Sequence, residues 1–221
     1  MGAFFYLHNM KVISTNISLA PKSFMWNGAE EKTGIYKYPT ANGLFLGKTD
    51  VKDDTVIDRK HHAGIDKACY LFPSDQYPFW RKKYPDLEWD WGMFGENLTI
   101  EGLDESKIRV GNTYRIGKAL VQVSQPREPC YKLGVKFGTQ NIIREFIAHN
   151  HPGTYVKIIE EGEVFAGDDL KLMEESNNPL TVQQFYELIF MKEKPQNLLK
   201  LFMENESVPQ YKKDRFLKYI K

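Results

Sequence analysis

The stretch VGNTYRIGKALVQVSQ, residues 110–125, decides the fold class because it has the pattern of a β-hairpin. Apolar and polar residues alternate on both sides of Gly117 and Lys118, which form a two-residue turn signal. The stretch YVKIIEEGEVFAGDDLKLM, residues 155–173, repeats this plan with Glu161 and Gly162 at its turn. The two stretches predict two β-hairpins.

Shorter strand signals precede these hairpins, at residues 12–18, 43–51 and 67–73. One helix interrupts them, because apolar residues at 142, 143, 146 and 147 form one face of a helix over 141–150. A second helix is expected within 74–86, although it contains Pro78. The chain from 11 to 173 is therefore predicted to be a mainly β domain with peripheral helices.

The sequence changes character after Met173. Residues 174–179 are polar and rich in turn formers, and Thr181 and Gln184 then have the spacing of a capping box. Helical periodicity continues through 196–204 and 211–220. Residues 179–221 are predicted to form a small α-helical subdomain.

Composition excludes several classes of protein. The 221 residues are 42% hydrophobic and 27% charged, which suits a globular core, and the net charge of +1 provides no bulk attraction for nucleic acid or an anionic membrane. The two cysteines, Cys69 and Cys130, make neither a disulfide framework nor a zinc motif. The N-terminal residues lack the basic and long apolar regions of a signal peptide, so we expect a cytoplasmic protein.

Cys130 stands out within SQPREPCYKL, residues 124–133. Pro126 and Pro129 stiffen this segment and favour an extended backbone. Arg127 and Lys132 lie nearby in sequence, and positive charge favours the thiolate form of cysteine. The alternative is that Cys130 is a small buried hydrophobic residue, as many free cysteines are.

Two further clusters of polar residues could likewise have either a functional or a purely structural role. Asp66 and Lys67 could form a surface ion pair, or Lys67 could bind an anion, whereas Cys69 in the apolar run 67–73 is predicted to belong to the core. In WGMFGENL, residues 91–98, glycines permit close backbone approach, and Glu96 and Asn97 could line a pocket or cap a turn. The sequence contains no dinucleotide fingerprint, P-loop, HExxH zinc motif or serine nucleophile elbow.

The three clusters occur in a definite order, as HAGIDKA (62–68), FGENL (94–98) and SQPREPCYKL (124–133). Together they resemble the MOSC domain family, in its YiiM-like branch, over nearly the whole chain. The helical tail is similar to the three-helix C-terminal extension of that branch. Two positions depart from the family pattern: Ala63-Gly64 replaces Gly-Gly, and Gly111-Asn112 replaces Gly-Asp. The second departure removes a carboxylate from a turn.

The resemblance implies a β-barrel-like core that binds the molybdenum cofactor (molybdopterin), with the thiolate of Cys130 as the protein ligand to molybdenum. Soft sulfur ligands suit such a metal, and a stiff basic loop would hold the thiolate still. The phosphate of the cofactor requires cationic side chains, for which Arg127, Lys67 and then His62 are the candidates.

The remaining candidate cofactor-binding residues lie in the motifs 124–133 and 94–98. Ser124 and Gln125 are expected to contact the pterin, while Glu96 and Asn97 either shape the pocket or brace the barrel.

The implied activity is an oxidoreductase that reduces N-hydroxylated compounds, such as hydroxylamino purines and related N-oxygenated substrates, and so detoxifies N-hydroxylated bases. The sequence has no flavin or nicotinamide motif, so the electrons are expected from a separate reductase. We expect no nucleic-acid or membrane partner. The sequence does not determine the oligomeric state, and a homodimer is one possibility.

Three other functions compete with this one. The same cysteine could carry sulfur as a persulfide, and the domain could be a non-catalytic binding module whose tail recruits a partner. Thiol exchange between Cys69 and Cys130 is weakly supported, because the chain has no CxxC motif and Cys69 is expected to be buried.

Overall fold

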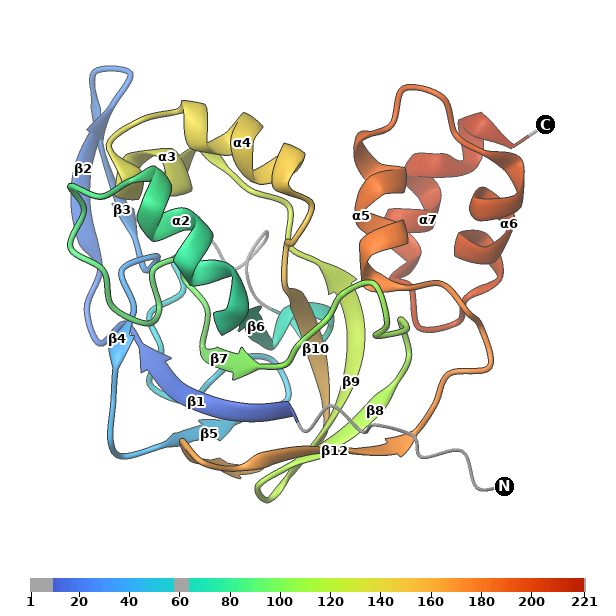
Figure 1. Cartoon of the computed structure of the whole chain (residues 1–221), viewed down its shortest axis with the longest axis horizontal. Coiled ribbons are helices and arrows are strands. Elements are labelled where there is room, and N and C mark those ends of the chain that lie inside the picture. The colour runs from blue at the N-terminus through green and yellow to red at the C-terminus, as the bar shows by residue number, and fades with distance from the viewer. Residues whose placement is uncertain (1–9, 58–63, 221) are drawn as a thin grey trace.

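The computed structural model describes residues 10–57 and 64–220, and its centre is a closed β-barrel (Figure 1). The strands follow the order β12-β8-β9-β10-β6-β7-β1, and a pairing between β12 and β1 closes the ring. Neighbouring strands are antiparallel except for β6 and β7. The barrel strands are β1 (Met10–Ile17), β6 (Cys69–Pro73), β7 (Leu98–Glu101), β8 (Thr113–Ile116), β9 (Ala119–Pro126), β10 (Thr154–Glu160) and β12 (Asp169–Glu174). The prediction of a mainly β, barrel-like core is confirmed.

Five short strands lie outside this ring. β2 (Lys22–Trp26) and β3 (Ala29–Thr33) form a projecting hairpin, and β4 (Tyr38–Pro39) pairs with β1 (Figure 1). β5 (Leu44–Leu46) pairs with β11 (Gly162–Val164).

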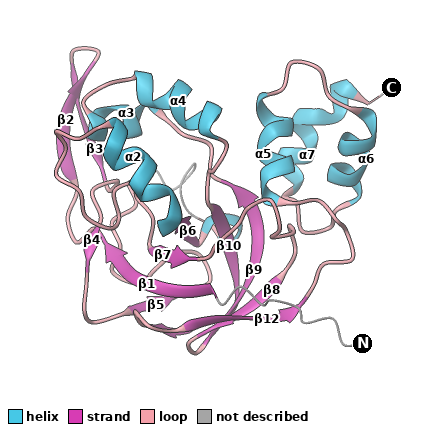
Figure 2. Cartoon of the chain, in the orientation of Figure 1, coloured by secondary structure: helices cyan, strands magenta, loops and turns pink. Residues whose placement is uncertain are grey.

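The helices gather in two groups, one on each side of the upper part of the barrel in Figure 2. The first group consists of α2 (Tyr77–Lys83), α3 (Tyr131–Phe137) and α4 (Asn141–His149), and the second of α5 (Val182–Phe190), α6 (Gln196–Glu204) and α7 (Gln210–Phe216). Short 3₁₀ turns occur at η1 (Ile65–Lys67), η2 (Ser74–Gln76) and η3 (Leu217–Tyr219). Among the described residues, no helix is both long and apolar enough to cross a membrane.

The first predicted hairpin is confirmed and the second is wrong. β8 and β9 pair directly across the turn, with Ile116 opposite Ala119. In the stretch 155–173, by contrast, β10 pairs with β6 and β9, β11 with β5, and β12 with β8 and β1. Gly162 permits close packing there, because a Cβ at this position would lie 2.6 Å from the carbonyl carbon of Lys118.

The helical predictions are confirmed at α4 and α2, and α3 is an addition to them. Pro78 lies in the first turn of α2, where its missing N–H breaks no helical hydrogen bond. The segment 124–133 was expected to be extended, but this conformation ends at Cys130 and α3 begins at Tyr131. Its two prolines precede the helix and so do not prevent it.

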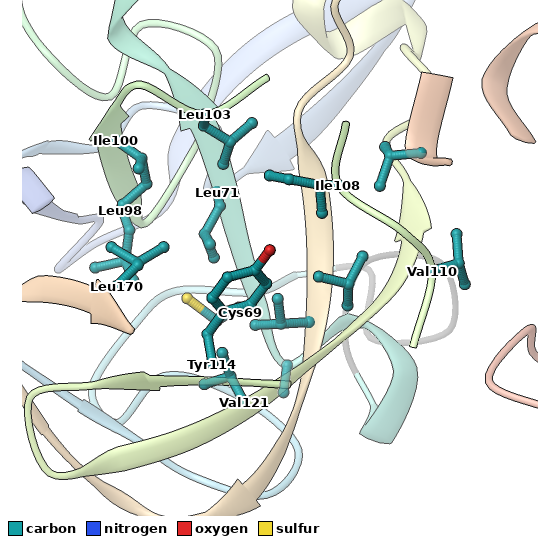
Figure 3. Close-up of a cluster of buried hydrophobic side chains, with 14 of the residues drawn as sticks. Cys69, Leu71, Leu98, Ile100, Leu103, Ile108, Val110, Tyr114, Val121 and Leu170 are labelled. Carbon is teal, nitrogen blue, oxygen red and sulfur yellow. The ribbon is translucent and has the colours of Figure 1, made fainter. Parts of the chain in front are cut away.

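The described residues form two apolar cores. The larger one occupies the barrel interior, where Cys69, Leu71, Leu98 and Tyr114 approach one another (Figure 3). The predicted burial of Cys69 is confirmed, because its exposed fraction is 1%. The second core is largely aromatic and packs α2, α3 and α4 against the barrel.

The helical extension is joined to the barrel. Phe185, Phe202 and Phe216 belong to the same hydrophobic cluster as the barrel interior. Asn112, at the departure from the family pattern, accepts a hydrogen bond from the backbone of Ser176 at 2.9 Å and donates one to the Tyr114 hydroxyl at 3.2 Å. The amide thus supplies one acceptor and one donor at this position.

The predicted capping box at the start of α5 is present. The Thr181 hydroxyl accepts from Gln184 N, and the Gln184 side chain accepts from Thr181 N, both at 3.1 Å. Thr181→Ala is expected to lower the free energy of unfolding by about 1 kcal/mol, measured by urea denaturation. Thr181→Ser keeps the hydroxyl and is expected to stay near the parent. Equal stability of the two variants would show that the cap contributes nothing.

Candidate functional site

A cavity beside Cys130 brings together segments that lie far apart in the sequence. It forms where the residues after β3, the η1 turn, the start of β7 and the loop after β9 meet. Its described lining consists of Thr33, Gly34, Ile35, Lys37, Asp50, Val51, Asp54, Thr55, Val56, Ile57, Lys67, Ala68, Tyr70, Gly95, Asn97, Arg127, Cys130, Lys132 and Tyr155. Four of the predicted site residues, Lys67, Asn97, Arg127 and Cys130, are therefore brought together.

Cys130 and Cys69 are in different environments. Cys130 is partly exposed, follows Pro129 and occupies the N-cap position of α3 with an extended backbone. Cys69 is buried, and burial raises the pKa of its thiol, with Lys37 opposing this shift and Asp54 adding to it. Cys130 is therefore the thiol that can react with or coordinate a molecule in the cavity.

Arg127 places a buried positive charge in the cavity wall. Its exposed fraction is 4%, and its Nη1 atom has no hydrogen-bond partner among the described residues. The guanidinium carbon lies 5.2 Å from the centre of the Tyr70 ring and 5.6 Å from that of Phe146. Within the described parts of the chain, no carboxylate lies within 4.0 Å of this guanidinium. A buried cation without a paired anion is costly, so the arrangement fits an anionic ligand.

The other charges in the cavity are mostly positive. Of its described lining residues, four are cationic and two are acidic. Asp54 forms an ion pair with Lys37 and also accepts a hydrogen bond from Asn97 Nδ2 at 2.9 Å. Lys67 and Lys132 add to the charge of Arg127, so the cavity carries an excess of positive charge.

Tyrosines complete the wall around Arg127. The Tyr70 and Tyr155 rings lie 5.1 Å apart, and burial raises the pKa of both phenols, with Arg127 opposing the shift. Tyr70 Oη donates to the carbonyl of Pro152 at 2.7 Å. Both residues therefore remain neutral phenols near pH 7.

Glu96 lies behind the cavity and braces its wall. Its buried carboxylate accepts hydrogen bonds from Gly92 N and Phe94 N, both at 3.0 Å, from Thr99 Oγ1 at 2.9 Å and from Tyr77 Oη. The adjacent Asn97 does line the cavity, and its Oδ1 atom accepts from Tyr70 N at 3.3 Å.

The glycines of this motif allow the close approach that the sequence indicated. Gly95 has φ +79°, and a Cβ there would lie 2.9 Å from Ile35 Cγ1.

Ser124 and Gln125 are also positioned behind the cavity. Ser124 Oγ donates to the carbonyl of Asp66 at 2.7 Å, and Gln125 Nε2 donates to the same carbonyl at 3.2 Å. These bonds hold the η1 turn, which carries Lys67. Neither residue lines the cavity, so a direct contact with a pterin remains a prediction. His62 lies outside the described residues.

Lys37, Asp54, Tyr70 and Tyr155 line the cavity without having been singled out from the sequence. Tyr70 lies in the predicted strand 67–73, and Tyr155 starts the predicted strand at 155. No local motif marks Lys37 or Asp54, and only the closure of the barrel brings them to Cys130.

The difference between the two cysteines predicts selective alkylation. In the folded protein, iodoacetamide is expected to modify Cys130 and leave Cys69 untouched, because burial both shields Cys69 and disfavours its thiolate. Mass spectrometry of peptides should locate the adduct. Cys130→Ser should remove the reaction, whereas denaturation of the parent should expose both thiols. Modification of Cys69 before unfolding would contradict this assignment.

Arg127 is expected to contribute little to the stability of the cofactor-free protein. Arg127→Met removes a buried charge that has no paired carboxylate among the described residues, so the free energy of unfolding should stay within about 1 kcal/mol of the parent in urea titrations. Arg144→Met removes an exposed guanidinium and is the control. A loss of about 3–5 kcal/mol, as for a broken buried ion pair, would contradict this view.

Comparison with known proteins identifies relatives of this chain. The family model of the MOSC domain matches residues 58–171. YflK of Bacillus subtilis strain 168 is 35% identical over 172 residues, which cover 78% of this chain and 77% of that protein. YiiM of Escherichia coli strain K12 is 33% identical over 154 residues, covering 69% and 68%.

Two further matches bear on activity and fold. A protein of Gibberella moniliformis named Reductase is 30% identical over 151 residues, which span 66% of this chain but 27% of that protein. The crystal structure of YiiM from Geobacillus stearothermophilus superposes with a TM-score of 0.78 at 26% identity, covering 96% of this chain and all of that one. The chain belongs to the MOSC domain family.

Proposed function

We propose that the protein is a molybdenum-cofactor-dependent reductase of N-hydroxylated compounds. The observation that carries this proposal is that Cys130 shares its cavity with the buried guanidinium of Arg127, whose Nη1 atom has no hydrogen-bond partner in the part of the chain that the structure describes. A thiol and an uncompensated cation are the two protein groups needed to hold a metal and an anionic cofactor tail.

The residues of the cavity fit such a cofactor. Arg127 would bind an oxygen of the phosphate, because its planar guanidinium presents several fixed donors. Lys67 and Lys132 would supply further positive charge, and Asn97 would shape the wall near Tyr70. Cys130 would provide the thiolate ligand from a loop that Pro129 stiffens. The protein therefore offers separate groups for the two ends of the cofactor.

When bound, the cofactor would supply two-electron chemistry at molybdenum. The overall reaction converts R–NHOH, two protons and two electrons into R–NH2 and water, so that the N–O bond breaks. The electrons would come from a separate reductase protein. The role of this chain is to position the thiolate, to neutralise the phosphate and to shield the reacting groups from water.

The family supports the proposal at a coarser level. MOSC domains are associated with molybdenum cofactor binding, and one relative of this chain is named Reductase. That relative is much longer than the segment it shares with this chain, so its name supports reductase chemistry without identifying a substrate.

Sulfur transfer is the main alternative, because a persulfide would form on the same Cys130 thiol. The uncompensated charge of Arg127 favours the cofactor reading, since a persulfide carrier does not require a buried anion site. A non-catalytic binding module would need neither Cys130 nor Arg127.

The test is to express the protein in a host that makes the cofactor and to measure molybdenum per protein and reduction of a hydroxylamino purine. Electrons should be supplied by a chemical reductant of sufficiently low potential. The parent should contain molybdenum and be active. Cys130→Ser and Arg127→Met should each lose at least about tenfold in activity, which corresponds to about 1.4 kcal/mol.

Cys69→Ala is the matched control, because it removes the other thiol far from solvent and should keep the parent's metal content. An active Cys130→Ser variant with full molybdenum would eliminate the ligand role of this thiol. Absence of molybdenum from all variants, with supply of cofactor verified in the host, would favour sulfur transfer or a binding module.

A further inference from the structure

Helix α7 of the C-terminal extension lies directly against the loop that carries Cys130. The buried ammonium of Lys212 pairs with Glu128, and Arg215 Nη1 reaches the same carboxylate at 3.2 Å. Tyr211 Oη donates to Gln125 Oε1 at 2.8 Å. Three residues within two turns of α7 therefore hold the two ends of the segment 125–128.

The same helix also approaches Lys67, another lining residue of the cavity. Lys67 Nζ lies 5.7 Å from the centre of the Tyr211 ring and 6.0 Å from that of Tyr155. Gln125 links these parts, since its Nε2 atom donates to the Asp66 carbonyl beside Lys67 while its Oε1 atom accepts from Tyr211. Tyr211 thus contacts both the Cys130 loop and the turn that presents Lys67.

The position of Glu128 affects that of Cys130, because the two residues are joined by a short and stiff piece of backbone. Pro129 alone separates the two residues, and proline fixes its own φ while restricting the residue before it. Arg127, on the other side of Glu128, carries the cavity's buried charge. A displacement of Glu128 would therefore move both the thiol and the guanidinium.

The ion pair between Lys212 and Glu128 is not expected to contribute much to the stability of the fold. The exposed fraction of Lys212 is 3%, and burial lowers its pKa, with repulsion from Arg215 and Lys67 adding to the shift. The paired carboxylate of Glu128 favours the charged form of this ammonium. Buried ion pairs often add little to stability but do select one geometry. Phe216, buried in the main hydrophobic cluster, already anchors α7 through apolar contact.

We propose that α7 is a positioning element of the cavity, in which Lys212 and Tyr211 hold the Cys130 loop and Lys67 in their working arrangement. The C-terminal extension is then part of the site. This inference rests on the proposed function only in taking Cys130 as the working thiol, and its test needs no cofactor.

The test is the pH profile of Cys130 alkylation by iodoacetamide in the cofactor-free, folded protein. Lys212→Met should raise the midpoint of the profile by at least about 0.5 pH unit, which is about a threefold lower rate below the midpoint. The reason is that Glu128 keeps its negative charge two residues from the thiol and loses its main counter-charge. Lys212→Arg keeps the cation and should restore most of the parent's profile.

Lys213→Met is the matched control, because it removes the same charge from the next residue of α7, and Lys213 has no ion pair with a described residue. Its profile should equal that of the parent. A merely structural role for Lys212 would lower the melting temperature without moving the midpoint. Identical midpoints for folded Lys212→Met and Lys213→Met would overturn the proposal.

If Lys212→Met does not fold, Glu128→Gln tests the same ion pair by changing its other partner, which lies in the Cys130 loop. The Glu128 side chain is partly exposed, so its replacement by the isosteric amide is tolerable. Loss of its negative charge should lower the midpoint, and Lys212→Met in this background, where no carboxylate is left without its partner, should add no further shift because Lys212 acts through Glu128. An unchanged midpoint in Glu128→Gln would contradict the proposal. Failure of the parent to bind molybdenum would contradict the proposed function instead, and would leave this result standing.

Discussion

The guanidinium of Arg127 is buried against two aromatic rings, with no paired carboxylate among the described residues, and the cavity is built around this charge. The nearby phenols of Tyr70 and Tyr155 are neutral, so they can accept a hydrogen bond but cannot cancel the charge. The acidic side chain of Asp54 is already committed to Lys37 and Asn97. The buried charge of Arg127 thus attracts an anion to the cavity. An apolar residue at this position would make the folded protein more stable but would not attract an anion.

Strand β9 delivers this charge and the thiol to the same place. It pairs with β8 as far as Gln122 and with β10 as far as Pro126, and Ser124 and Gln125 near its end support the η1 turn. The chain then leaves the barrel through Pro126 and Pro129 and enters α3 directly after Cys130. A rigid strand, a stiff loop and a helix therefore confine Cys130, while α7 closes the outer side of the loop.

The sequence predicted those features that short segments determine by themselves. The 110–125 hairpin, α4, the capping box at Thr181 and the burial of Cys69 follow from local periodicity and turn chemistry. The pairing of β10, β11 and β12 could not be predicted in this way, because their partners β5, β6, β8 and β1 are distant in sequence.

The candidate site could be predicted only where its residues lie in recognisable local motifs. Arg127 and Cys130 lie close together in one motif, and Lys67 and Asn97 lie in motifs of their own, so all four could be singled out. Glu96 is adjacent to Asn97, but its carboxylate accepts hydrogen bonds from backbone N–H groups instead of lining the cavity. The sequence alone does not show this, because the bonds depend on the folded turn. Lys37 and Asp54 have no motif at all.

The most direct measurement of the central claim is molybdenum K-edge X-ray absorption on protein loaded with cofactor. The account predicts that the parent spectrum contains one sulfur neighbour of molybdenum that is missing from the spectrum of Cys130→Ser. Equal numbers of sulfur neighbours in the parent and the variant would contradict it, and would leave the cavity with a bound anion but without a thiolate ligand.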